Sequence, residues 1–577
     1  MEVPGFVIGT SGLIAVAQLC LDIARAIDGI RAFKEDSASL YAVYNFEQVR
    51  LALWLAHVVG VTQPSPAVDS EALRRMEITE SQMPVVLTSG SPINLHEPLR
   101  NALTEVARIL GKLNKLLTKY ETAGAGDATV MTRIKFQTRL FKEGGRDEIK
   151  ALLGQLKTWN DSLDSVVESR MRHHLAATMH VRLLAAAQTD EQLEVVQGAA
   201  RETHPVLGQE AAFRRELLGI ECRGDGGGQQ SSGLSVSLDH LSPGSPPAAL
   251  KDGSLRCMGR LSRPGQPTIR ILQEWKLGQP NWGDLERTTA TARADQLASI
   301  LRLETKPPRL RCLDLVAYAL RDGPRGRLDF CFLYRPPPFA DGSSSPPTTL
   351  HAALSLSERR RPSLAQRFRV AAALAGSVLA LHGAGWLHKA VCGANVLFFA
   401  DAQTERLDFS QPFVAGFEFA RPDTVRDLTL EGGPGGGDGS GSGGGFFAPY
   451  CHPELVASLA GGAVAGGGRR RHQRRFDIYG LGVVLLEIGC WMSAATILAS
   501  RRRGGQDSDS ASAHEHLMRT AAEALPSRVG TRYKQAVCAC LTWEADTEGE
   551  DGEARQRQIE EFADRVVGVL GECHCSF

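Results

Sequence analysis

The sequence predicts a multidomain protein, an all-α helical bundle followed by an α+β domain, and three observations support this fold class. From about residue 5 to 205, apolar side chains recur at helical spacing with few internal prolines. Residues 223–247 are rich in Gly, Ser and Pro, a composition that cannot bury enough apolar area to offset its ordering entropy. Beyond them, strand-like runs come first and long helical stretches follow. We therefore expect domains at residues 1–205 and 251–577, with a flexible linker at 206–250.

Length and composition are those of an ordinary soluble protein. The 577 residues exceed a single core, and 43% hydrophobic with 23% charged residues is typical of globular domains. The formal net charge of zero gives no overall attraction to nucleic acid, so no nucleic-acid partner is expected. The 12 cysteines are scattered, which indicates free thiols in a reducing compartment and a cytoplasmic location. The two C-x-C pairs lack the ligand spacing of a structural zinc site, so no metal is expected.

Four long amphipathic stretches predict the helices of the bundle. They are residues 6–33, 39–59, 98–120 and the run that follows Arg146. In each, apolar residues recur every three or four positions, which is the pattern of one helix face packed against other helices.

The first of these stretches also has a property of membrane spans. Val3 to Leu21 contains no charged residue and is about as long as a bilayer is thick. No Lys or Arg precedes it, which argues against a signal peptide. A G-x-x-x-G step permits close approach of helices in lipid. Two interpretations stay open, an ordinary buried helix and a helix able to enter a membrane. The candidate membrane-active residues are Gly5, Gly9, Leu13 and Val16.

Strands and helices are both predicted in the second domain. Residues 268–275 and 328–334 read as strands, and residues 364–382 and 478–492 read as helices. Insertions rich in Gly, Ser or Arg interrupt this half and are predicted to be mobile loops. They cover residues 431–445, 461–475 and 501–512.

The segment LHGAGWLHKAVCGANVLF, residues 381–398, resembles the catalytic loop of protein kinases. The family signature there is H-R-D-x-x-x-x-N. His388 and Asn395 have the matching spacing, but Ala390 stands where the catalytic Asp is expected. Alanine can neither accept the proton of a substrate hydroxyl nor hold that hydroxyl by a hydrogen bond. The resemblance therefore implies a bilobal protein-kinase-like fold without its catalytic base.

Downstream, FVAGFEFARP at residues 413–422 resembles the kinase segment that carries D-F-G. With Phe417 in the Phe position, Gly416 replaces the metal-binding Asp and Glu418 replaces the Gly. Glycine has no carboxylate for a hard cation. Glu418 could supply one only if the backbone were displaced. The second catalytic position is thus degenerate as well.

Fold-level landmarks of the kinase family are better preserved. Pro453 and Glu454 in YCHPE resemble the A-P-E motif, whose Glu pairs with an arginine in the family. Asp477 takes the position that supports the backbone of the catalytic loop. No G-x-G-x-x-G motif occurs ahead of a strand in this half, so ATP binding is unsupported and no cofactor is expected. Lys276, at the end of ILQEWK, is the candidate phosphate-pairing lysine, and a strand-end lysine in solvent is the alternative.

The first half resembles the HeLo domain of fungal cell-death and prion-associated proteins, also described as a prion-inhibition and propagation domain. The resemblance rests on the apolar opening EVPGFVIGTSGLIAVAQLCLDIARAIDGI and on KEGGRDEIKALLGQLKTWNDSL. In that family such a bundle releases its first helix into a membrane and permeabilises it. This implies a role in programmed cell death, with membrane contact through the first helix and a homo-oligomer on activation.

Together the two resemblances predict a signalling effector in which a pseudokinase, which is not an enzyme, regulates a helical bundle and responds to a regulatory protein partner. On activation the cytoplasmic protein would become membrane-associated. Two alternatives stay open. An atypical ATP-dependent protein kinase would transfer phosphate without either aspartate, and a protein-binding scaffold would have no membrane activity.

Overall fold

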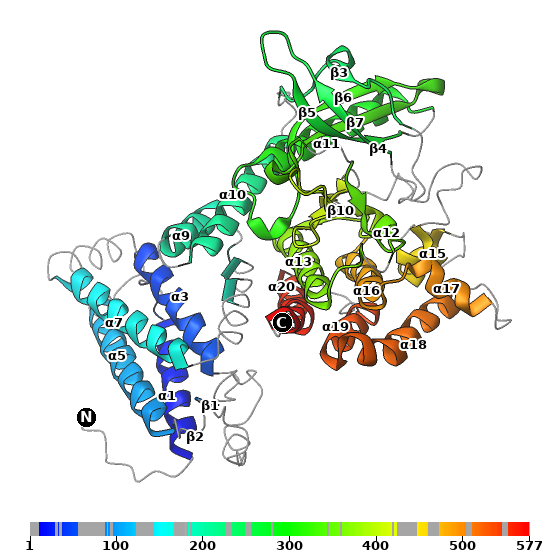
Figure 1. Ribbon diagram of the computed structural model, residues 1–577. Helices are drawn as coiled ribbons and strands as arrows, with labels where there is room; N and C mark the ends of the chain where they lie inside the picture. The colour runs from blue at the N-terminus through cyan, green and yellow to red at the C-terminus, as the bar shows by residue number, and fades with distance from the viewer. Residues whose placement is uncertain are drawn as a thin grey trace. The chain divides into compact units, whose positions relative to one another are not determined.

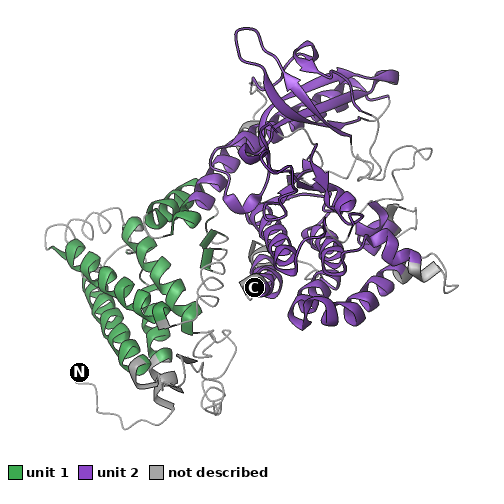
Figure 2. Ribbon diagram, in the orientation of Figure 1, with its two compact units in different colours: residues 1–208 green, residues 209–577 purple. Residues whose placement is uncertain are grey.

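The computed structural model (Figure 1) describes residues within 11–55, 87–122, 144–166, 179–225, 233–247, 255–423, 447–459, 472–502, 510–544 and 552–575, with short gaps in several of these ranges. The chain divides into two compact units, unit 1 at residues 1–208 and unit 2 at residues 209–577 (Figure 2). Unit 1 is mainly helical, and unit 2 joins an antiparallel sheet to a set of helices. The coarse prediction of a helical half followed by an α+β half is confirmed.

The helices of unit 1 follow the four predicted amphipathic stretches. α1 packs against α5, α5 and α3 pack against α7, and α3 also contacts α9. A short hairpin of β1 and β2 accompanies them. The bounds are α1 Ser11–Asp28, α3 Ala38–Trp54, β1 Leu87–Thr88, β2 Ser91–Pro92, α5 His96–Thr122, α7 Gly145–Val166 and α9 Asp190–Ala200.

Buried polar contacts fix α3 against α7. The indole of Trp54 donates to the Leu163 carbonyl at 3.1 Å, and the Asn160 amide donates to the Glu47 carboxylate at 2.8 Å. Burial raises the pKa of Glu47. Arg50 on α3 adds an ion pair with Asp164 at 2.5 Å. These hydrogen bonds satisfy groups that would otherwise be costly to bury between the two helices.

A five-stranded antiparallel sheet with strand order β3-β4-β5-β7-β6 forms one part of unit 2. Helix α11 packs against β6 and β7. The predicted strands at 268–275 and 328–334 correspond to β5 and β7. The bounds are β3 Leu241–Ser242, β4 Arg256–Leu261, β5 Ile269–Lys276, α11 Asp284–Arg302, β6 Asp314–Asp322 and β7 Leu328–Arg335.

The helical part of unit 2 is built around α13 and α16, which contact each other and are largely buried (Figure 1). Both were predicted from sequence. Short strands, β8 to β12, flank the loops of this part of the unit. The elements are β8 Thr348–Thr349, α12 Leu350–Ala353, α13 Leu364–Gly383, β9 Trp386–Leu387, β10 Val396–Phe398, β11 Phe413–Val414, β12 Arg421–Pro422, α15 Pro453–Leu459, α16 Arg474–Cys490, α17 Ala494–Arg502, α18 Ser510–Val529, α19 Thr531–Leu541, α20 Gly552–Phe562, a π-helical turn Ala563–Gly568 and α21 Val569–Cys575.

The structure differs from the predicted flexible linker at 206–250. Helix α10, Pro205–Asp225, occupies its first part and buries Phe213, Leu217 and Ile220 in the same apolar cluster as α11. These residues recur at helical spacing, a pattern that the neighbouring glycine-rich composition obscured. Further along, Leu234 is buried in this cluster, and a bridge joins Ser235 to Tyr318.

Two of the predicted insertions are also shorter than expected. Arg474 and Arg475 begin α16, and the residues at either end of 501–512 belong to α17 and α18. The insertion at 431–445 lies outside the described residues.

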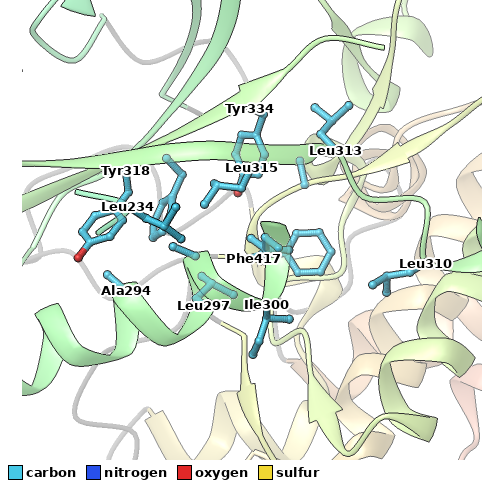
Figure 3. Close-up of a cluster of buried hydrophobic side chains, with 14 of the residues drawn as sticks. Leu234, Ala294, Leu297, Ile300, Leu310, Leu313, Leu315, Tyr318, Tyr334 and Phe417 are labelled. Atoms are coloured by element: carbon cyan, nitrogen blue, oxygen red, sulfur yellow. The ribbon is translucent and has the colours of Figure 1, made fainter. Parts of the chain in front are cut away.

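The apolar cluster connects the two parts of unit 2. Leu297 and Ile300 of α11 pack with residues of the sheet and with Phe417, which comes from the segment after β11. Figure 3 shows the Phe417 ring above Ile300 and below the strands that carry Leu315 and Tyr334. Residue 416 is therefore held against the sheet by the burial of its neighbour.

Candidate functional site

The candidate site is the loop between β9 and β10, which contains His388, Ala390 and Asn395. Lys389 has a left-handed backbone with φ of 66°, and a 3-10 turn covers Gly393–Asn395. His388, Ala390 and Asn395 are all buried. The loop is thus a fixed part of the unit, held by contacts from both the helices and the sheet.

Asp477, in the first turn of α16, holds the backbone of this loop. Its carboxylate accepts the N–H groups of His388 at 2.7 Å and Lys389 at 2.8 Å. The rings of His382 and His472 lie 3.2 and 3.1 Å from the same carboxylate. Burial alone would raise the pKa of Asp477, but the hydrogen bonds from the two histidines lower it well below its usual range. Asp477 therefore supports the backbone of the loop at His388 and Lys389.

Arg256 and Glu274 form a buried ion pair directly beside the loop. They are cross-strand partners on β4 and β5. The guanidinium of Arg256 donates to the Glu274 carboxylate at 2.5 Å, to the Ala394 carbonyl at 2.6 Å and to the Asn395 side-chain oxygen at 2.5 Å. Arg256 thereby binds the sheet to the 3-10 turn of the loop.

Glu274 completes this network on the other side. Its carboxylate accepts the backbone N–H of Gly416 at 3.2 Å. The amide of Asn395 in turn donates to the Ala390 carbonyl at 2.8 Å. Asn395 belongs to the catalytic-loop motif, and residue 416 is where the kinase resemblance implies a metal-binding Asp. Both are hydrogen-bonded to a single ion pair.

A side chain does not fit at position 416 in this arrangement. Gly416 has φ of 82°, which L-residues rarely adopt, and a Cβ atom there would lie 2.2 Å from the Asn395 amide nitrogen. An aspartate at this position would require both the backbone and Asn395 to move. Glu418, the residue considered as a substitute ligand, lies outside the described residues.

Lys276 lies at the end of β5, opposite Phe330, and is half-buried. Glu274, two residues earlier, is the β5 residue whose carboxylate contacts Arg256 and Gly416. Sequence reasoning missed Arg256 and Glu274. Glu274, a charged residue in the interior of the predicted strand ILQEWK, was the available signal, because a buried charge requires a partner.

The second group of landmarks lies at the start of α15. Glu454 pairs with both terminal nitrogens of Arg475, at 3.0 and 2.8 Å, and Pro453 is the first residue of the helix. Nearby, the Tyr450 hydroxyl and the Ala494 N–H both donate to the buried Glu487 carboxyl, at 2.7 and 2.8 Å. Burial raises the pKa of Glu487 to about 7.

The candidate membrane-active residues are only partly described. Gly5 and Gly9 lie outside the described residues, and Leu13 and Val16 belong to α1 although their side chains are not described. Other residues of α1, such as Cys20 and Ile27, are buried. Among the described helices, α13 alone is long and apolar enough to cross a bilayer, and half of that stretch is buried in unit 2, as in a core helix.

No group of three or more His, Cys, Asp or Glu side chains in the described residues could hold a metal ion. Comparison with protein-family models and with curated proteins finds no match for this chain. The site is therefore interpreted from its own geometry.

Proposed function

We propose that this chain is a signalling effector of the cell-death type, in which a kinase-like unit 2 without phosphotransfer activity regulates a helical unit 1 that acts at membranes. Both resemblances, the helical unit 1 and the sheet-plus-helix unit 2 support this proposal. A regulatory partner that favours one conformation of unit 2 would shift the population toward release of the first helix and oligomerisation.

The observation that carries the proposal is the Arg256–Glu274 ion pair. Phosphoryl transfer in kinases relies on a catalytic Asp and on carboxylate and amide ligands for magnesium. Here Ala390 and Gly416 provide no carboxylate, and the oxygen of Asn395 is bound to Arg256. The ion pair supports a structural role for Asn395 and Gly416, since it links the sheet to both through charge-assisted hydrogen bonds.

Nucleotide binding by the full chain tests the regulatory half of this proposal. At saturating ATP, the melting temperature should be the same with and without magnesium, because the positions that bind magnesium in kinases have no carboxylate here. A magnesium-dependent increase would instead favour the atypical kinase, and phosphate transfer that is lost in Lys276→Ala would establish it.

Leakage from liposomes tests the membrane half. Gly5→Leu and Gly9→Leu should impair leakage while leaving the bundle folded. A leucine side chain at either position would prevent the close helix packing in lipid that glycine permits. Gly154→Leu is the matched control, since position 154 is exposed on α7 and nothing lies within 4 Å of a Cβ atom added there. Intact leakage by Gly5→Leu and Gly9→Leu would contradict insertion of the first helix, and absence of leakage with the unaltered protein would favour the scaffold without membrane activity.

A further inference from the structure

The β4–β5 ladder presents three rows of paired side chains on one face, and each row has a different chemistry. The row nearest Asn395 is the ion pair described above, the middle row is apolar, and the outermost row places two arginines opposite each other. The pairs, in that order, are Arg256 with Glu274, Met258 with Leu272, and Arg260 with Arg270.

The outermost row is electrostatically unfavourable as it stands. Like charges directly opposite each other on neighbouring antiparallel strands are destabilising. In the described part of the chain, neither Arg260 nor Arg270 is paired with a carboxylate. Arg270 donates one terminal N–H to the Ala340 carbonyl at 3.4 Å, which tethers its guanidinium toward the segment after β7. Most donors of both side chains remain available to a ligand.

These two arginines line an open surface cavity large enough for a small molecule. Its volume is about 740 Å³, and its lining includes Ser242, Met258, Arg260, Thr268, Arg270 and Gly342. The cavity beside His388 and Phe417 offers only about 20 Å³, which is room for about one water molecule. Space for a ligand therefore lies at the arginine row and not beneath the loop.

We propose that this cavity binds a small organic anion, whose phosphate or carboxylate group is held by Arg260 and Arg270 and whose apolar part rests on Met258. Arginine is suited to this role because its planar guanidinium donates two parallel hydrogen bonds to such groups. The site requires no metal ion, since positive charge is supplied by the protein. This goes beyond the proposed function, and it does not depend on unit 1 acting at membranes.

Titration of the full chain with inorganic phosphate, pyrophosphate and citrate tests the site by calorimetry at low and high salt. At least one of these anions should bind without magnesium, and more weakly at high salt because exposed charges are screened. Arg260→Gln or Arg270→Gln should weaken binding about tenfold or more, as expected for the loss of a hydrogen bond between charged groups. Arg302→Gln, an exposed arginine at the end of α11, should bind as the unaltered protein does.

Arg260→Glu provides a second test, in which the charge at position 260 is reversed. It converts the like-charge row into an ion pair with Arg270, so the melting temperature without anion should rise while stabilisation by anion disappears. Vesicles of phosphatidylcholine with and without phosphatidic acid distinguish a lipid headgroup from a soluble anion. Arginine-dependent binding to the acidic vesicles alone would identify the headgroup as the source. Absence of binding to every anion and vesicle, or binding that persists in Arg260→Glu, would overturn the proposal.

Discussion

Replacing Glu274 with alanine removes the carboxylate that neutralises Arg256 and accepts the N–H of Gly416. The Arg256 side chain is only 5% exposed, so its charge would remain buried with two neutral acceptors, the Ala394 carbonyl and the Asn395 oxygen. Breaking a buried ion pair from one side typically costs about 3–5 kcal/mol. We expect Glu274→Ala to reduce the free energy of unfolding of unit 2 by about this amount.

The double variant Arg256→Met with Glu274→Leu removes both charges and supplies apolar volume. Replacement of a buried pair by apolar residues is often neutral, so the double variant should recover most of the loss seen in Glu274→Ala. Urea unfolding of the full chain, followed by fluorescence of Trp275 and Trp386 with the other tryptophans replaced by phenylalanine, reports on unit 2. A cost below about 1 kcal/mol for Glu274→Ala, with simple additivity in the double variant, would refute the idea that this pair binds the sheet to the loop.

Three other substitutions test separate parts of the chain. Asp477→Asn should destabilise unit 2 by on the order of 3 kcal/mol at neutral pH. Because the folded-state pKa of Asp477 is lowered, this contribution is present above the unfolded pKa of about 4 and is lost as pH falls, so the difference in urea midpoint should shrink in acid. Glu487 has a raised folded-state pKa of about 7, so roughly 3 kcal/mol of stability should be lost as pH rises from about 4.5 through 7. Glu487→Gln should reduce the decrease in melting temperature with rising pH across that range. A pH dependence equal to that of the unaltered protein would contradict the raised pKa of Glu487. Phe213→Ala should cost about 3–5 kcal/mol in urea unfolding, whereas Val206→Ala, at an exposed position of the same helix, should change stability little.

Local spacing was sufficient to predict much of the fold. The helical stretches of unit 1, strands β5 and β7, and helices α13 and α16 were all readable from apolar periodicity. The spacing of the catalytic-loop residues and of Asp477 was also readable, because those positions lie within short continuous motifs. The structure places Asp477 in contact with this loop.

The parts that were missed depend on pairing across the chain. The role of Arg256 can be recognised only from the register of β4 against β5, because that register places Arg256 opposite Glu274. A single sequence does not give this register. Lys276 was selected from this strand because the kinase resemblance implies a lysine at its end, and that resemblance gives no role to Glu274. Helix α10 was read as linker because the glycine-rich composition that follows it dominated the interpretation of the whole stretch.

Helix α10 also determines where the protein can be divided. A fragment that begins at residue 251 would retain α11 and the sheet strands β4 to β7, but it would lose β3. It would also lose Phe213, Leu217 and Ile220 from the apolar cluster that covers α11. Exposed apolar surface of this kind promotes aggregation, so such a fragment is expected to be poorly soluble. A fragment that begins at Pro205 keeps this cover. The glycine-rich run after α10, which looks like a natural cleavage point, is therefore an internal segment of unit 2 in sequence and a poor place to truncate.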